Sequence, residues 1–303
     1  MLWPMVSRRG FLRSLPGAVP AMAAALTPPA AEPIIDIHQH TSYSGRSDAE
    51  LIAHQREMGV SRTVLLPAGS KYGLGGGIGG NESVVALARQ HRDGYRFFTN
   101  ELPDIADARA VLEKYLNAGA IGIGEQKFPV YIDSPAIELL AEIAREYQVP
   151  VLLHFEHNNY NLGFVDFPKV VARHPKVIFI GHAQTWWGNI DKNHNQAELY
   201  PKTPVTPGGI TDRLLADFAN VYGDMSAGSG LNSMLRDEEH ARDFPKRHQN
   251  KLLFGSDCAD RKANGPDCLG SKIIAAIQRL APDKKAERKI LCGNASRLLK
   301  IQV

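Results

Sequence analysis

Two histidines close the stretch Ile34–His40, which reads IIDIHQH. The apolar residues before them predict a buried strand, and side chains two residues apart on a strand point to the same face of the sheet. We therefore expect His38 and His40 to point the same way at the end of this strand, as two ligands of one metal ion would. A pair of solvated loop histidines is the alternative, so the remainder of the chain has to decide between the two.

Strand-like and helix-like segments alternate from this stretch to the end of the chain. Eight apolar segments predict strands at 34–38, 63–66, 95–99, 120–128, 149–155, 177–182, 220–224 and 252–256. Helices are predicted after the capping box at 47–50 and over 82–91, 107–117, 134–147, 167–174, 211–218, 239–248, 272–280 and 295–300. Such alternation forms a parallel sheet, and eight units in the 270 residues after Pro33 match a (β/α)8 TIM barrel of about 250 residues.

An open, doubly wound sheet is the competing architecture. It would carry a glycine-rich phosphate-binding turn after its first strand. The glycine-rich segment 73–80 instead follows the second strand and has no evident acidic partner. We therefore favour the barrel and expect this segment to be a flexible loop over its mouth.

The first 32 residues differ from the rest of the chain. The pair Arg8-Arg9 is followed by a short apolar run, Leu15–Leu26, and by Ala-X-Ala sequences suited to cleavage. These features are typical of an export signal, and the arginine pair resembles a twin-arginine signal. We predict a signal and linker over 1–32, a single barrel over 33–303, and export by the twin-arginine machinery to the periplasm or the cell exterior. No stable membrane anchor is expected, and a disordered basic tail is the alternative.

The composition fits an ordinary globular enzyme, with 44% hydrophobic and 22% charged residues among 303. Three arginines and one glutamate lie in the first 32 residues, which leaves 32 basic and 31 acidic residues beyond them. This near balance gives no support to a nucleic-acid partner, which usually requires a basic face. We expect a small-molecule substrate, and the sequence does not indicate an oligomeric state.

Polar residues end most of the predicted strands. The C-terminal ends of barrel strands meet at one mouth, which carries the active site in barrel enzymes. A charge placed directly after apolar residues is costly unless it is paired or binds a metal. We therefore expect these groups to converge on one point. They are His38 and His40 on the first strand, Glu125 and Lys127 on the fourth, His154 and His157 on the fifth, His182 on the sixth, Asp224 on the seventh and Asp257 on the eighth.

The order of these residues resembles the amidohydrolase superfamily, with His-X-His after strand one, a histidine after strands five and six, and an aspartate after strand eight. The closing segment Gly293–Leu299, GNASRLL, is similar to the last helix of the amidohydrolase-2 (amidohydrolase-related) family. That family includes lactonases, other hydrolases and decarboxylases. The resemblance implies that His38, His40, His154 and Asp257 are metal ligands and that His182 is a catalytic residue or a ligand of a second metal.

Glu125 and Lys127 share a strand face. In some members of the superfamily a carboxylate at this place bridges two metal ions, whereas in the amidohydrolase-2 branch a single metal is commoner and strand four often carries a substrate-binding lysine. Glu125 is therefore either a bridging ligand or an ion-pair partner of Lys127, and the number of metal ions, one or two, depends on it. Asp36 lies deeper on the first strand, so we expect it to orient a histidine ligand rather than bind the metal.

Imidazole and carboxylate ligands suit zinc, with other first-row divalent metals as alternatives. We expect a metal-activated water to attack the carbonyl of a lactone, ester or amide. Asp257 would take the proton from this water and return it to the leaving group, and His182 would help to stabilise the oxyanion. The alternative reaction is decarboxylation of an unsaturated or keto acid, with Lys127, Arg46 or Arg261 holding the carboxylate. A non-catalytic exported binding protein is the third alternative.

Lys127, Arg46, His157 and Trp186 are the candidate substrate contacts. Arg46 closely follows the metal motif, and His157 lies just beyond His154. Trp186 belongs to the long segment 184–207, which we expect to form an aromatic lid or an oligomer contact, because long irregular segments are often functional.

The remaining histidines and the cysteines are expected to have no part in the chemistry. We predict that His54, His194, His240 and His248 are solvated. The cysteines are too few for a disulfide framework, and we expect Cys258 to be a small buried apolar residue.

Overall fold

The computed structural model describes residues 1–2, 32–70, 75–263 and 268–303. The chain divides into the units Met1–Ala31 and Glu32–Val303. The predicted export signal and linker therefore lie almost wholly outside the described residues. Among the helices of the described part, none is both long and apolar enough to cross a membrane.

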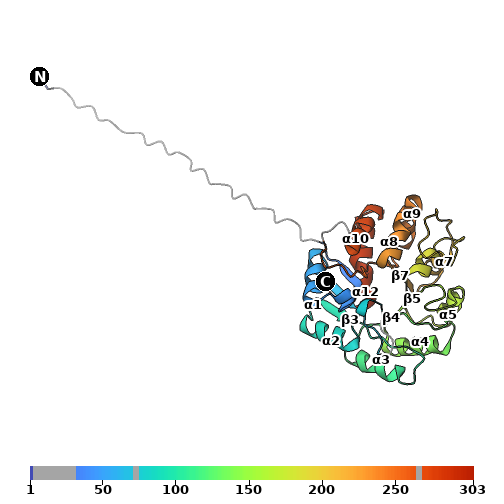
Figure 1. Ribbon diagram of the computed structural model, residues 1–303. Helices are drawn as coiled ribbons and strands as arrows, with labels where there is room; N and C mark the ends of the chain where they lie inside the picture. The colour runs from blue at the N-terminus through green and yellow to red at the C-terminus, as the bar shows by residue number, and fades with distance from the viewer. Residues whose placement is uncertain (3–31, 71–74, 264–267) are drawn as a thin grey trace. The chain divides into compact units, whose positions relative to one another are not determined.

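Parallel strands form the centre of the unit Glu32–Val303 (Figure 1). They are arranged as β1-β2-β3 and as β4-β5-β6-β7-β8, and every neighbouring pair is parallel. In the part of the chain that the structure describes, the strands are β1 (Ile35–Gln39), β2 (Arg62–Leu65), β3 (Tyr95–Phe97), β4 (Ile123–Gln126), β5 (Val151–His154), β6 (Phe179–His182), β7 (Val221–Asp224) and β8 (Leu252–Leu253). Each overlaps a predicted strand.

Backbone hydrogen bonds join the two groups of strands into a closed barrel. Beyond the end of β3, the Thr99 amide donates to the Gly122 carbonyl just before β4, at 2.9 Å. At the other junction, the Ile37 amide of β1 donates to the Phe254 carbonyl just after β8, at 3.1 Å. The predicted TIM barrel is therefore confirmed.

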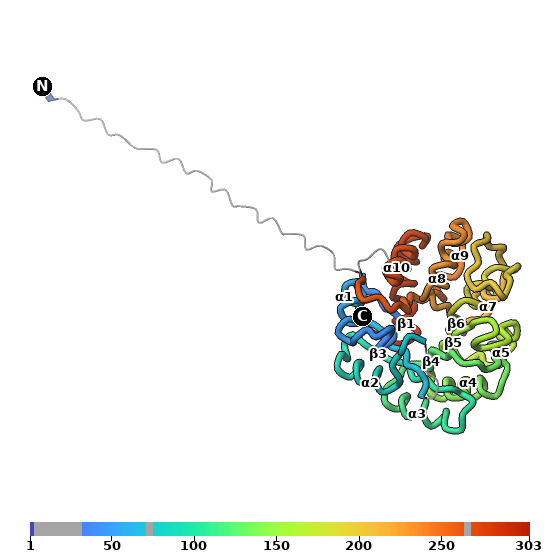
Figure 2. Tube along the Cα trace, in the orientation of Figure 1, coloured from blue at the N-terminus to red at the C-terminus, as the bar shows by residue number. Residues whose placement is uncertain are grey.

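Helices surround the strands, as the trace in Figure 2 shows. This arrangement follows from strand–helix alternation, because each right-handed crossover places its helix outside the barrel. Ser47 begins the first helix with the predicted capping box, in which its amide donates to Glu50 at 2.8 Å. The helices are α1 (Asp48–Glu57), α2 (Asn81–Gln90), α3 (Ala108–Asn117), α4 (Pro135–Tyr147), α5 (Phe167–Arg173), α6 (Gln184–Gly188), α7 (Ile210–Asp217), α8 (Ala227–Leu235), α9 (Glu238–His248), α10 (Leu269–Leu280), α11 (Lys284–Arg288) and α12 (Asn294–Leu299).

Two apolar layers hold the barrel together. The outer faces of the strands pack against the helices in one large buried cluster. The inner cluster contains Ile35, Ile37, Val64, Leu66, Phe98, Leu152, Ile180 and Leu253, together with Ala295 and Leu299 of α12. Because apolar side chains fill the interior, polar groups from the strands gather at the C-terminal ends.

In the described part of the chain, three helices were not predicted from the sequence: α6, α8 and α11. Gly228 and Gly230 give α8 a low intrinsic helix propensity, but the helix packs against α10. A side chain at Gly230 would place its Cβ 2.1 Å from the Met225 carbonyl oxygen, so only glycine permits this close approach. Residues 73 and 74 of the expected mouth loop lie outside the described residues.

Candidate metal centre

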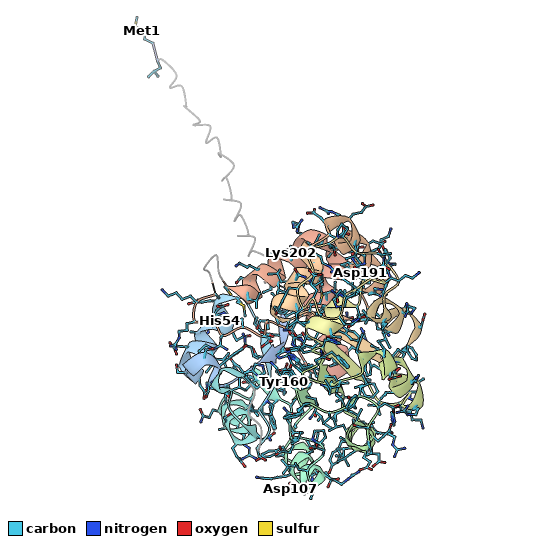
Figure 3. All side chains as sticks on the ribbon, turned by 45° about the vertical axis from the view of Figure 1, so that its right-hand side comes forward. Met1, His54, Asp107, Tyr160, Asp191 and Lys202 are labelled. Atoms are coloured by element: carbon cyan, nitrogen blue, oxygen red, sulfur yellow. The ribbon has the colours of Figure 1, made fainter. Side chains whose placement is uncertain are left out.

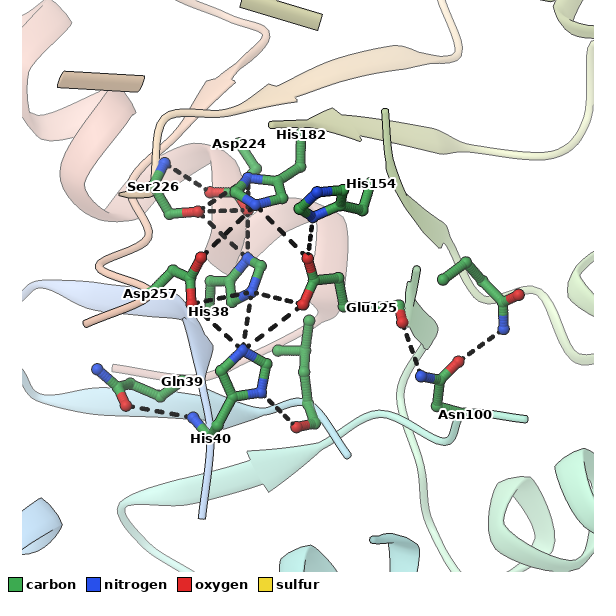
Figure 4. Close-up of polar contacts among 12 residues, drawn as sticks. His38, Gln39, His40, Asn100, Glu125, His154, His182, Asp224, Ser226 and Asp257 are labelled. Atoms are coloured by element: carbon green, nitrogen blue, oxygen red, sulfur yellow. Dashed lines mark hydrogen bonds and ion pairs between the residues drawn. The ribbon is translucent and has the colours of Figure 1, made fainter. Parts of the chain in front are cut away.

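Side chains from several strand ends converge in one cluster (Figure 4). The Nε2 atoms of His38 and His40 lie 3.2 Å apart. Oε2 of Glu125, from β4, lies 3.5 and 3.6 Å from these two nitrogens. Oδ1 of Asp257, which follows β8, lies 3.8 and 3.3 Å from them. His182 of β6 places its Nε2 3.6 Å from an oxygen of Glu125 and 3.6 Å from an oxygen of Asp257.

The spacing of these donor atoms fits the coordination shell of a divalent metal ion. Ligands about 2.1 Å from zinc in tetrahedral geometry lie about 3.4 Å from one another. Ligand-forming atoms of His38, His40 and Asp257 form one group compatible with this spacing, and those of His38, Glu125 and His182 form a second group that shares His38. The Nε2 atom of His182 is buried and has no hydrogen-bond partner, as expected of a group that faces an ion or a substrate.

Glu125 was expected either to be a bridging ligand or to form an ion pair with Lys127. Its carboxylate points at the histidines. Its Oε2 points to the His-X-His pair and its Oε1 hydrogen bonds to Nδ1 of His154. Burial disfavours the ionised carboxylate, but His154 and His38 together hold the pKa of Glu125 well below its ordinary range. Lys127 instead places its Nζ over the ring of Tyr160, 5.5 Å from the centroid. Glu125 therefore lies among ligand-forming side chains, and its binding of a metal ion stays a prediction.

His154 lies beside Glu125 and His182, and its expected place among the ligands stays a prediction. Its Nδ1 is bonded to Glu125, and its Nε2 lies 3.4 Å from Oε2 of Glu156. Both ring nitrogens thus face carboxylates, and one of these carboxylates, Glu125, belongs to the ligand-forming group with His38 and His182. His154 orients Glu125 in this arrangement.

Asp224 and Ser226 contact the Nδ1 side of His38 and His182, a positioning function that sequence analysis missed. Oδ2 of Asp224 lies 2.6 Å from Nδ1 of His38 and 3.3 Å from Nδ1 of His182. Ser226 donates its hydroxyl to the same oxygen at 2.9 Å. Burial lowers the pKa of His38, but the charges of Asp257 and Asp224 outweigh it and raise that pKa well above its ordinary value. The position of Asp224 at the end of the seventh strand was the available signal.

Asp36 does not hold a histidine ring, in contrast to the expectation. Its carboxylate accepts hydrogen bonds from the backbone amides of His38 and Ser256, at 3.0 and 2.9 Å, and from the side chain of Gln55 at 3.1 Å. The register of β1 against β2 shifts between Asp36 and Gln39, which breaks strict alternation along the strand. Asp36 therefore fixes the backbone of the two strands that carry His38 and Asp257.

Burial largely determines the protonation state of His182. The residue is fully buried, and this burial is the main reason that its pKa falls to about 3. The neutral imidazole is the form that can bind a metal through a ring nitrogen. Its Nδ1 faces Asp224 and Ser226, which leaves Nε2 directed at the donor cluster.

Arg46 is not at the substrate side, which corrects its predicted contact. Its side chain is buried and its guanidinium donates to the Asp260 carbonyl at 2.8 Å and to Oε1 of Gln39 at 2.5 Å. These hydrogen bonds use both terminal nitrogens of the guanidinium, which would otherwise be available to a substrate carboxylate. Arg46 therefore positions Gln39, which lies between the two metal-motif histidines.

Trp186 belongs to the hydrophobic core, so the expected aromatic lid is wrong for this residue. It is completely buried, and its ring stacks on Phe155 with centroids 6.1 Å apart. A Cβ at Gly181 of β6 would lie 2.2 Å from the indole ring. The ring therefore fills the space between α6 and the outer face of the barrel.

Lys127 and His157 keep positions compatible with substrate contact. Burial disfavours the charge on Lys127, but attraction to Glu125 and Asp257 raises its pKa. His157 lines a cavity of about 440 Å³ that also includes Glu156, the neighbour of His154. The substrate contacts of both residues stay predictions.

Three of the histidines expected to be solvated are buried. His248 is 3% exposed and its Nε2 lies 2.6 Å from Oδ1 of Asp212. His240 is buried beside Phe244. His54 is completely buried beside two cysteines. Sequence position alone did not indicate these tertiary contacts.

Comparisons with solved structures show the same fold. An uncharacterised TIM-barrel protein from Bordetella bronchiseptica has a TM-score of 0.62 and 17% identity, over 88% of this chain and 98% of that chain. A putative 2-pyrone-4,6-dicarboxylic acid hydrolase from Pseudomonas putida has a TM-score of 0.62 and 15% identity, over 89% and 98%. A 2,6-dihydroxybenzoate decarboxylase complexed with 2,6-dihydroxybenzoate has a TM-score of 0.56 and 14% identity, over 89% and 99%.

Comparisons of the sequence are consistent with this fold. No curated protein matches the chain. The family model described as Amidohydrolase matches residues 35–301, from the start of β1 to just beyond α12. Because this match spans nearly the whole barrel and the ligand-forming residues lie within it, the chain belongs to the amidohydrolase-2 family of the amidohydrolase superfamily.

Proposed function

We propose that the protein is a metal-dependent hydrolase that acts on the carbonyl of a lactone, ester or amide. The position of Asp257 carries this proposal. Its Oδ1 faces His38 and His40, its Oδ2 faces His182, and its side chain is 13% exposed, whereas the side chains of those histidines are at most 1% exposed. A carboxylate that borders both the ligand cluster and the open side of the site is suited to take a proton from a water and return it to a leaving group.

The surrounding residues have complementary functions in this proposal. A bound divalent ion supplies a Lewis acid and lowers the pKa of water toward about 7. Neutral His182 faces the same space, where its Nε2 is available to the ion or the reacting oxygen. The charge of Asp257, with burial, raises the pKa of Tyr43, whose ring lies 5.3 Å from that of His40. Tyr43 therefore stays protonated and can donate a hydrogen bond to the substrate.

We propose zinc as the ion because two imidazoles and two carboxylates are ligands that zinc accepts. Manganese and other first-row divalent metals also bind imidazole and carboxylate ligands. Export by the twin-arginine route is proposed on the arginine pair alone, and it would deliver the folded protein with its metal already bound.

Decarboxylation of an unsaturated or keto acid is the second candidate, and Lys127 supplies the cation that it needs. A charged lysine near Asp257 and Glu125 is available to pair with a substrate carboxylate. The same lysine would also serve a hydrolase whose substrate carries an acidic group. Both candidates therefore predict an anionic carbonyl compound, and they differ in whether CO₂ leaves.

Metal analysis and a substrate panel test the proposal. The purified protein should contain zinc or manganese, and the double variant His38→Ala with His40→Ala should lose one equivalent of metal per chain together with turnover. Acidic lactones, esters and amides should be hydrolysed, and carboxylic acids should be assayed in parallel for CO₂ release. Turnover that is unchanged in a double variant lacking the ion of this centre would refute a metal-dependent reaction of either kind.

Two single variants separate the functions of the residues. Asp257→Asn should lower kcat by at least about 100-fold, the usual scale for a group that transfers a proton, whereas Asp93→Asn, at an exposed position, should not. Lys127→Met should raise KM for anionic substrates and leave neutral esters unaffected, with the exposed Lys176→Met as its control. CO₂ release without any hydrolysis would replace the first candidate by the second.

A further inference from the structure

A second cluster of metal-ligating side chains lies away from the centre described above. It consists of His54 on α1 and of Cys258, Asp260 and Cys268, which come between β8 and α10. His54, Cys258 and Cys268 are at most 2% exposed, and Asp260 is partly exposed. Figure 3 marks His54 on the side of the barrel where α1 lies.

The distances within this cluster are those of ligands around one ion. Nε2 of His54 lies 3.7 Å from Sγ of Cys258 and 3.4 Å from Sγ of Cys268. In tetrahedral zinc, a sulfur at about 2.3 Å and an imidazole nitrogen at about 2.05 Å are about 3.6 Å apart. Ligand-forming atoms of His54, Cys258 and Asp260 also lie within 4.8 Å of one another. Nε2 of His54 thus lies within 3.7 Å of both sulfurs, the Asp260 carboxylate is grouped with His54 and Cys258, and Cys268 joins the cluster through His54.

The surroundings favour thiolate at one of these sulfurs. Cys268 is the N-cap of α10, and its Sγ accepts a hydrogen bond from the Ser271 amide at 3.4 Å. The hydrogen bond from Cys258, followed by those from Ser271 and His54, lowers the pKa of Cys268 to about 5, although burial opposes this change. The same hydrogen bond, together with burial, raises the pKa of Cys258, so the pair favours one thiolate before an ion binds. Thiolate is the form of cysteine that binds metals.

Buried Arg46 balances the charge of the cluster. Its guanidinium donates to the Asp260 carbonyl, so one permanent positive charge lies beside these residues. A divalent cation neutralises two thiolates, and Arg46 offsets the remaining carboxylate of Asp260. The set would therefore be electrically neutral, which buried charges require.

We propose that His54, Cys258, Cys268 and Asp260 bind a second divalent metal ion, of the zinc class, at a structural site. Neutral Nε2 of His54 would give its lone pair to the ion, and the two thiols would release their protons to solvent as they bind. Two sulfurs, one nitrogen and one oxygen complete a tetrahedral shell, which is closed to water in structural sites. The ion would attach the residues after β8 to α1.

This site would also support the first one through Gln39. The Gln39 amide donates to Sγ of Cys258 at 3.5 Å and to Oγ of Ser256 at 2.7 Å. Gln39 lies between His38 and His40, and Cys258 directly follows Asp257. An ion at the second site would thus limit movement of residues adjacent to three ligands of the first.

Cobalt substitution tests the proposal without any substrate. Co²⁺ bound to thiolate absorbs in the near ultraviolet through sulfur-to-metal charge transfer, whereas the first centre offers only nitrogen and oxygen donors. Protein purified under reducing conditions, stripped of metal and reloaded with Co²⁺ should therefore show this band. The result is independent of whether the first centre is a hydrolase, a decarboxylase or inactive.

Variants assign the band to the cluster. Cys258→Ser and Cys268→Ser should each weaken it by about half or abolish it, and His54→Ala should lower the metal content by one equivalent per chain. Cys292→Ser is the matched control, because Cys292 is buried in the inner cluster and should leave the band intact. Fully reduced wild-type protein that binds Co²⁺ without a thiolate band would overturn the proposal, as would a Cys258–Cys268 disulfide in protein purified with its metal.

Discussion

Asp224 is expected to determine how tightly the first centre holds its metal. Its Oδ2 lies 2.6 Å from Nδ1 of His38 and accepts the hydroxyl of Ser226, while its Oδ1 accepts the Ser226 amide at 3.0 Å. Both oxygens therefore act as acceptors. A proton on Nδ1 of His38 leaves Nε2 free to bind the ion.

The variant Asp224→Asn keeps the shape of the side chain but replaces one acceptor by a donor. An NH₂ at the Oδ1 position would meet the Ser226 amide, so two donors would face each other. An NH₂ at the Oδ2 position would require Nδ1 of His38 to accept, which places the proton on Nε2 and blocks the ligand. Loss of such a partner typically costs 10- to 100-fold in metal affinity, or about 1.4 to 2.7 kcal/mol.

Competition with a chromophoric chelator measures this affinity. We expect Asp224→Asn to show a metal dissociation constant about 10- to 100-fold higher than wild type, at unchanged far-ultraviolet circular dichroism. Asp166→Asn is the control, because Asp166 forms only an exposed ion pair with Lys169. Wild-type metal affinity in a folded Asp224→Asn protein would refute the reasoning about the His38 tautomer.

Two further predictions concern stability. Trp186→Ala should lower the free energy of unfolding by about 3 to 5 kcal/mol, since it empties a fully buried position. Trp186→Phe should lower the free energy of unfolding much less, because the indole NH has no hydrogen-bond partner that the variant would lose. Equal urea midpoints for wild type and Trp186→Ala would contradict the position of Trp186 in the core. Asp212→Asn should cost about 1 to 3 kcal/mol at pH 7, because Asp212 accepts from Arg247 and lies 2.6 Å from Nε2 of His248. Burial opposes ionisation, but these two partners lower the pKa of Asp212 below its ordinary range. The unfolded chain therefore binds the proton first as pH falls, so this stabilisation is full above about pH 5 and declines below about pH 4. Urea titrations should show the difference between wild type and variant shrinking over that interval, and a difference that grows with acid would exclude this cause.

Much of the barrel could be predicted because its signals are local. An apolar run such as the one before His38 specifies a strand without reference to any other residue, and the Ser47 capping box specifies a helix start in the same way. The helix α8 was missed because its glycines oppose helix formation locally, and packing against α10 outweighs that preference.

The candidate site was predictable to the extent that strand ends could be located. Residues at the ends of parallel strands meet in a barrel, which brought His38, His40, His182 and Asp257 together as expected. Which side chain faces the ion was not predictable in the same way. The hydrogen bond between Glu125 and His154 is an example, because it joins two strands and no local pattern specifies it.

Sequence by itself determined the alternation of strands and helices, the family, and the strand ends that carry ligands, since all of these depend on residue type and spacing along the chain. The tertiary structure alone decided that Arg46 and Trp186 are buried, that Asp224 contacts His38, and that His54 contacts two cysteines. These are contacts between residues far apart in the sequence, and their partners are chosen by packing and by the pairing of buried charges, which no local pattern encodes.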